Sequence, residues 1–133
     1  MKQNFVLIFS LMMLFSCDHI EKKKVQNSAL IGSWTLSSVA EFNDKGKGNI
    51  TTFNVCPIIV FNIDGIGQTP GDFFQWYSDN RKVTINYVEN RNKKDFVIDG
   101  GTYEIKYTDR KTYLEAVLTN SNKKISYFLG KNK

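Results

Sequence analysis

Apolar and polar side chains alternate along most of the chain after residue 29, and this period of two constrains the fold more than any other feature. Val83, Ile85 and Tyr87 share one face of such a segment, and β-branched and aromatic residues are frequent throughout. The alternating segments are 30–42, 82–88, 102–108, 112–118 and 124–130. A period of two indicates half-buried β-strands, and no helical period of useful length occurs after residue 29.

Clusters of Asn, Asp and Gly separate the apolar runs, as expected of turns. They lie at 43–49, 63–67, 78–81, 99–101, 108–111 and 120–123. About eight strands with short connections form either a sandwich or an up-and-down barrel. Because a sandwich needs some longer crossing connections, the sequence predicts an all-β fold, an antiparallel up-and-down β-barrel of about eight strands.

The amino terminus has the pattern of a signal peptide. Lys2 precedes an apolar run from Phe5 to Phe15 that only Ser10 interrupts. A helix of about 11 residues spans roughly 16 Å, too short for a hydrocarbon core of about 30 Å. Residues 1–16 are therefore predicted to direct secretion and not to span a membrane.

The run ends in Leu14-Phe15-Ser16-Cys17, which resembles the lipobox of bacterial lipoproteins. The resemblance implies that a diacylglyceryl group is joined to the Cys17 thiol and that the chain is cut just before it. Two or three acyl chains on Cys17 would hold the protein on a membrane, whereas one chain binds only marginally. An ordinary core cysteine at the end of a helix is the alternative.

Residues 17–28 are predicted to be the lipidated cysteine and a flexible tether, since the segment lacks aromatic residues and any period. Lys22–Lys24 are either a solvated spacer or a contact to anionic headgroups. We expect a lipid-anchored position in the cell envelope. The outer membrane facing the periplasm is favoured over the inner membrane and the cell surface.

Residues 29–133 have the size of one domain. Cys56 is the only cysteine besides Cys17, so it is expected to be a small buried apolar side chain, with an intermolecular disulfide as the alternative. The net charge is +5, but Lys and Arg are scattered among turns. This pattern argues against nucleic-acid binding. We expect a monomer.

Three motifs in order along the chain resemble lipocalin-like domains, in particular the small lipocalin-like lipoproteins of Bacteroidetes-type bacteria. They are the Gly-x-Trp of Gly32 and Trp34, the strand and turn at 56–65, and the tryptophan strand with its hairpin at 73–86. The resemblance covers nearly all of 29–130. It implies that Gly32 permits a tight turn and that Trp34 plugs the closed end of a barrel. Some members carry a second cysteine near the tryptophan strand, where this chain has Gly71-Asp72.

No catalytic or metal-binding pattern occurs. The one histidine, His19, lies in the tether, so a His/Cys metal site is not expected. Asp64, Asp79, Asp99 and Asp109 all lie in turns, and nothing selects a pair of them for acid–base chemistry. We expect neither an enzyme nor a cofactor.

Aromatic residues are abundant for so small a domain, and they leave two functions open. In the first, a hollow barrel binds a small hydrophobic or amphipathic ligand. Its predicted lining is Trp34, Phe61, Trp76, Tyr87 and Tyr103. In the second, these rings fill a solid core and the barrel is a protein-interaction module, either an accessory of an envelope complex or an enzyme inhibitor. An exposed patch with Phe73 or Tyr77 would favour the second function.

Overall fold

The computed structural model describes residues 28–79, 81–87 and 97–133. The predicted signal peptide, Cys17 and nearly all of the tether lie outside these residues. Within them the chain is all-β, with each strand antiparallel to its neighbours. The strands are β1 (Gly32–Phe42), β2 (Gly48–Thr52), β3 (Ile58–Phe61), β4 (Ile66–Thr69), β5 (Asp72–Asp79), β6 (Lys82–Tyr87), β7 (Gly101–Asp109), β8 (Tyr113–Asn120) and β9 (Ile125–Asn132).

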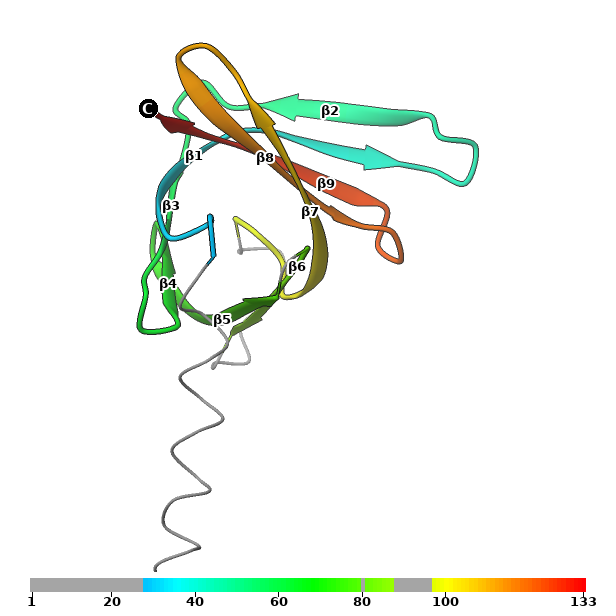
Figure 1. The fold of residues 1–133 in the computed structure, drawn as a ribbon. Helices are drawn as coiled ribbons and strands as arrows, with labels where there is room; N and C mark the ends of the chain where they lie inside the picture. Colours follow the sequence, from blue (N-terminus) through cyan, green and yellow to red (C-terminus); the bar gives the residue numbers. More distant parts are fainter. Residues whose placement is uncertain (1–27, 80, 88–96) are drawn as a thin grey trace, which may run out of the picture.

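Pairing between β1 and β9 closes the sheet into a barrel. Eight strands, β1 and β3 to β9, surround a common interior, which Figure 1 shows along the barrel axis. Consecutive strands are neighbours in this ring, as in an up-and-down meander. The predicted antiparallel up-and-down barrel of about eight strands, with its lipocalin-like architecture, is confirmed.

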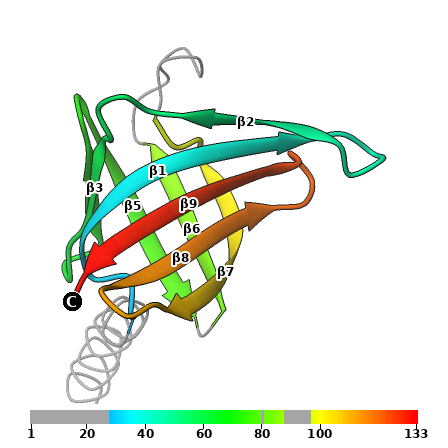
Figure 2. The same ribbon diagram turned by 90° about the horizontal axis from the view of Figure 1, so that it is seen from above.

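The sheet has a ninth strand, β2, because two separate strands, and not one long strand, pair with the same edge of β1. β2 pairs with residues 38–42 of β1, whereas β3 pairs with residues 32–35 on the same edge. In the gap between them, the Leu36 amide donates to the Pro57 carbonyl over 2.9 Å. The β1–β2 hairpin therefore projects beyond the ring of strands as an arm (Figure 1, Figure 2).

The predicted alternation determines which side chains fill the barrel. Trp34 and Leu36 are buried, while Ser33 and Thr35 between and beside them are exposed. The same inward face is confirmed along β6 to β9. Its buried members there are Val83, Ile85, Tyr103, Ala116, Leu118, Ile125, Tyr127 and Leu129.

Two short segments outside the strands close the two ends of the barrel. In Figure 1 residues 28–31 and 97–100 both lie within the ring, and Figure 2 places them at opposite ends. Each contributes a fully buried side chain, Leu30 at one end and Ile98 at the other. Neither segment was predicted as a plug.

At the first end, Gly32 turns the chain into β1 with a φ of +127°, a conformation that glycine adopts readily. The Trp34 indole N–H donates to the Leu30 carbonyl over 2.7 Å. The Lys131 amine donates to the Ile31 carbonyl over 2.8 Å and lies 5.6 Å from the centre of the Trp34 ring. Trp34 is thus fixed beside the segment that closes this end of the barrel.

At the second end, three tyrosines hold the backbone of residues 98–99. The hydroxyl of Tyr87 donates to the Ile98 carbonyl over 2.5 Å, and that of Tyr103 donates to the Asp99 carbonyl over 2.6 Å. The Asp99 amide donates to the Tyr127 hydroxyl over 3.1 Å. Because these backbone groups have side-chain partners, the segment can be buried without losing its hydrogen bonds.

Candidate functional site

The residues predicted to line a ligand pocket all belong to the interior. Phe61 and Tyr103 are fully buried, Trp34 and Trp76 nearly so, and Tyr87 is half-buried. Phe61 packs edge-to-face on Trp76, with ring centres 5.1 Å apart. Trp34 closes the first end of the barrel, so the five residues are distributed along the interior.

The interior rings pack against other parts of the chain. Phe74 links Phe61 to Tyr87, with ring centres 5.6 and 5.8 Å apart, and Tyr103 packs on Tyr127 at 5.7 Å. A void able to hold a ligand would leave accessible area on its lining, but Phe61 and Tyr103 have none. Ligand binding by these residues stays a prediction.

Burial also sets the protonation of the tyrosines at the second end. Loss of hydration raises the pKa of Tyr87 and of Tyr103 well above the ordinary phenol value. It raises the pKa of Tyr127 as well. These phenols are therefore neutral at any physiological pH, and two of them donate hydrogen bonds to backbone carbonyls.

The outer surface of β3, β4 and β5 exposes large apolar side chains. We call Ile58, Ile66, Phe73 and Tyr77 the apolar face; Phe73 is 67% exposed and Tyr77 41%. Ile66 pairs with Gln75, so it lies diagonally next to both Phe73 and Tyr77. Diagonal neighbours of this kind, about 7–8 Å apart, are within reach of aromatic side chains.

The same stretch of chain has an unusual charge. Residues 48–80 contain Asp64, Asp72 and Asp79 but no Lys, Arg or His, although the whole chain has 18 Lys and Arg. Asp64 and Asp79 are exposed and give the apolar face an acidic border on an otherwise basic protein, whereas Asp72 lies on the inward side of β5 with Phe74. The sequence predictions missed this border, which a count of charges along the chain would have found.

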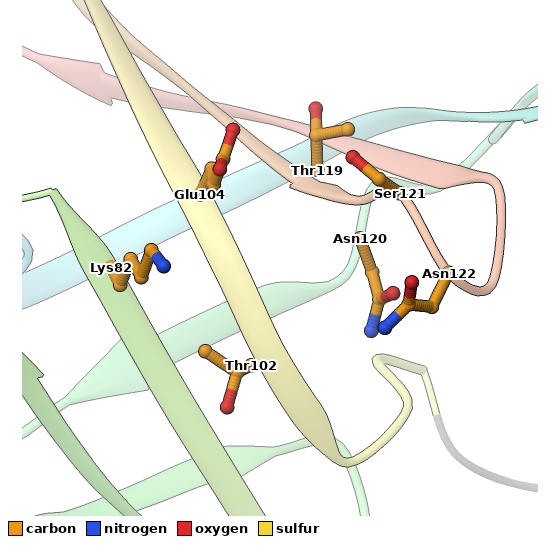
Figure 3. Close-up of a pocket in the computed structure, with 7 residues that line it drawn as sticks. All are labelled: Lys82, Thr102, Glu104, Thr119, Asn120, Ser121 and Asn122. Carbon is orange, nitrogen blue, oxygen red and sulfur yellow. The ribbon is translucent and has the colours of Figure 1, made fainter.

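A polar groove lies outside the barrel, across β7 (Figure 3). It has a volume of about 270 Å³. Its lining is Lys82, Thr102, Glu104, Thr119, Asn120, Ser121 and Asn122. Hydroxyls here bond to one another, Thr84 to Thr102 over 3.0 Å and Thr119 to Ser126 over 2.8 Å. Ligand sites are mainly apolar, so this groove is suited at most to a small polar molecule.

The remaining predicted features have local structural roles. Asp64 accepts a hydrogen bond from the Ile66 amide over 2.9 Å, and Asp109 forms an ion pair with Lys133. Cys56 is half-buried, with its thiol 3.8 Å from the Phe53 carbonyl oxygen, and it has no disulfide.

Two further features are absent from the described parts of the chain. No group of three or more His, Cys, Asp or Glu there could hold a metal ion. Nor does this part of the protein include a helix with the length and apolar character needed to cross a bilayer.

No family model matches the chain, and neither the curated proteins nor the solved structures give a significant match. Membership of a lipoprotein family therefore rests on the sequence motifs alone and stays a prediction.

Proposed function

We propose that this protein is a lipid-anchored interaction module of the cell envelope. Its barrel is the scaffold, and the apolar face on β3 to β5 binds a partner protein. One observation carries the proposal: Phe73, Ile66 and Tyr77 are exposed side by side on the outer surface, while the interior aromatic rings are packed.

The apolar face contributes nothing to the barrel core, because its side chains point away from it. Contiguous exposed apolar side chains with a polar border are typical of protein-binding surfaces. Asp64 and Asp79 give this border a negative charge, so the expected partner has a basic border around an apolar centre. An anionic lipid surface would be repelled by the same carboxylates, which favours a protein.

Photo-crosslinking in the producing cell tests this function. We would place a photoreactive amino acid at Phe73 and, as a matched control, at Thr84 on the outer surface of β6. Phe73 should give a crosslink to one protein with a basic surface, and Thr84 should give none. Purified partner should bind less tightly as salt rises and should bind poorly to Asp64→Asn/Asp79→Asn. Crosslinks to lipid alone, or the same products from both positions, would contradict the proposal.

The anchor is tested separately. Replacing Cys17 by Ser removes the only thiol in the lipobox-like motif, so the protein should be neither acylated nor retained in the membrane fraction. Mass spectrometry and membrane fractionation measure both properties. An acylated, membrane-bound Cys17→Ser protein would disprove the anchor but leave the apolar face untouched.

A second candidate function is the binding of a small hydrophobic or amphipathic ligand. One observation favours it: the apolar side chains of Ile105, Tyr107 and Leu114 pack against the core but are only half-buried. They could form a shallow entrance to the barrel. The two candidates differ in whether the purified protein retains a small molecule.

A further inference from the structure

β2 forms an open edge of the sheet. Among the described strands it pairs only with β1, and all five of its residues are exposed. An open edge offers backbone N–H and C=O groups to another strand. Proteins usually block such edges with Lys, Pro or other charged residues, but Gly48–Thr52 contains none of these.

The register shows which groups of β2 point outward. The Asn43 amide donates to the Lys47 carbonyl over 2.8 Å, which makes these two residues a hydrogen-bonded pair. The Phe42 amide instead donates to Lys124 on the other side of β1, over 3.0 Å. Because the two kinds of pair alternate in antiparallel strands, the backbone groups of Gly48, Ile50 and Thr52 point away from β1.

We propose that a second copy of this chain pairs with β2, antiparallel and about a two-fold axis at Ile50. In this arrangement Ile50 lies opposite Ile50 of the second copy, and Gly48 lies opposite Thr52. The three outward residues of each copy then exchange about six hydrogen bonds. Ile50, which is 70% exposed, is covered by a β-branched side chain of the same kind.

The charges of the arm are compatible with this pairing. The two-fold axis places Lys47 opposite Phe53 of the second copy, and Lys45 opposite Val55. Like charges therefore do not face each other along the edge. Val55, at 87% exposed, gains a contact with the aliphatic part of a lysine side chain.

The size of the edge determines the strength of the dimer. Five residues on each copy bury well below the ~1,200 Å² of stable interfaces. The dimer is therefore weak in dilute solution and forms where copies are concentrated, as on a membrane. Only this strength rests on the proposed lipid anchor. The monomer expected from the sequence would be the dilute state.

Disulfide trapping tests the geometry directly. In the full chain with Cys56→Ser, Ile50→Cys places two thiols opposite each other across the axis. Lys45→Cys is a matched control on the same arm, because two copies of residue 45 lie about 30 Å apart. Under mild oxidation in vesicles, Ile50→Cys should give at least five times as much dimer as Lys45→Cys. Equal yields would overturn the proposal.

A proline provides an independent test, because the Ile50 amide points outward and is not used by β1. In the Cys56→Ser background, Ile50→Pro should abolish energy transfer between copies labelled at Lys45→Cys, while circular dichroism stays unchanged and Ile50→Val retains the transfer. Unchanged transfer in Ile50→Pro would overturn the proposal.

Disulfide trapping of a protein that lacks Cys17 tests the β2 pairing independently of the proposed lipid anchor. Cys17→Ser/Ile50→Cys/Cys56→Ser at high protein concentration should still form the disulfide dimer in solution, whether or not the anchor exists. If the dimer yield of this variant in solution does not exceed that of the Lys45→Cys control, the proposed pairing is wrong, and the absence of a membrane does not explain the result.

Discussion

The inner surfaces of the two walls of the barrel, β3–β5 and β6–β9, carry the same kind of side chain, whereas their outer surfaces differ. Inside, Phe61 and Trp76 of one wall are buried as completely as Tyr103 and Leu118 of the other. Outside, β3–β5 expose apolar side chains, while β6 and β7 expose hydroxyls together with Lys82 and Glu104, which lie opposite each other. On β8 and β9, Val117 and Phe128 face outward but are half-buried.

Folding requires the inner pattern of both walls but not the outer difference. The polar outer surface of β6 and β7 shows that this barrel does not need large apolar side chains facing solvent on every strand. Those on β3–β5 are therefore best explained by a binding partner, in line with the proposed function.

Phe73 and Phe74 provide the largest contrast, because adjacent residues of one strand point to opposite sides. Phe74 is 1% exposed and packs on Phe61, whereas Phe73 is 67% exposed. Phe74→Ala should lower the free energy of unfolding by about 3–5 kcal/mol. Phe73→Ala should change it by no more than about 0.5 kcal/mol. Urea unfolding measures both, and similar losses in the two variants would break the comparison between inside and outside.

Tyr103→Phe sharpens the comparison within the interior by removing only a hydroxyl. The half-buried Asp99 carbonyl then loses its donor, so the free energy of unfolding should fall by about 1–3 kcal/mol. Tyr113→Phe, on the exposed side of β8, is the control and should change it by about 0.5 kcal/mol or less. A Tyr103→Phe protein as stable as the control would mean that the second end is not held as described.

High pH should weaken the second end. Burial raises the pKa of Tyr103 and Tyr127 in the folded state, so above about pH 10 these phenols ionise first in the unfolded state. The unfolded state then binds fewer protons, and the free energy of unfolding falls as pH rises further. Unfolding curves between pH 8 and 11 measure this slope, which should be shallower in Tyr103→Phe/Tyr127→Phe. A slope that the double variant leaves unchanged would assign the effect to other groups.

At the first end of the barrel, the charge of Lys131 should contribute less to the free energy of unfolding than the tyrosines contribute at the second end. Lys131 is half-buried, donates to the Ile31 carbonyl and lies over Trp34, so Lys131→Met should cost about 1 kcal/mol. Lys133→Met breaks only an exposed ion pair with Asp109 and should cost about 0–0.5 kcal/mol. Thermal unfolding of the two variants side by side measures the difference, and a reversed order would contradict the described closure.

The strands were predictable where the period of two was strong, as at Val83 and Ile85. β2 was not, because Gly48–Thr52 buries no side chain and so carries no apolar alternation. The plug at Ile98 was also missed, since its burial depends on three tyrosines from β6, β7 and β9. Local sequence cannot show such tertiary partners.

The candidate site was less predictable than the fold. Phe73 and Phe74 are chemically identical neighbours, and in the sequence only their alternation with Trp76 and Tyr77 indicates which one faces solvent. The structure resolves this because Phe74 is opposite Gly67, whose missing side chain leaves room for the ring. The inward position of the five predicted ligand residues could be anticipated, but their mutual packing depends on the closed barrel.

Native mass spectrometry tests most directly whether the interior is structural and the outer surface functional. The measurement uses the Cys17→Ser chain without residues 1–16, after exposure to a total lipid extract of the envelope. We predict an unliganded mass, because the interior rings have packed neighbours. A stoichiometric small-molecule adduct that disappears in Trp76→Ala would contradict this account and identify the barrel as a ligand carrier.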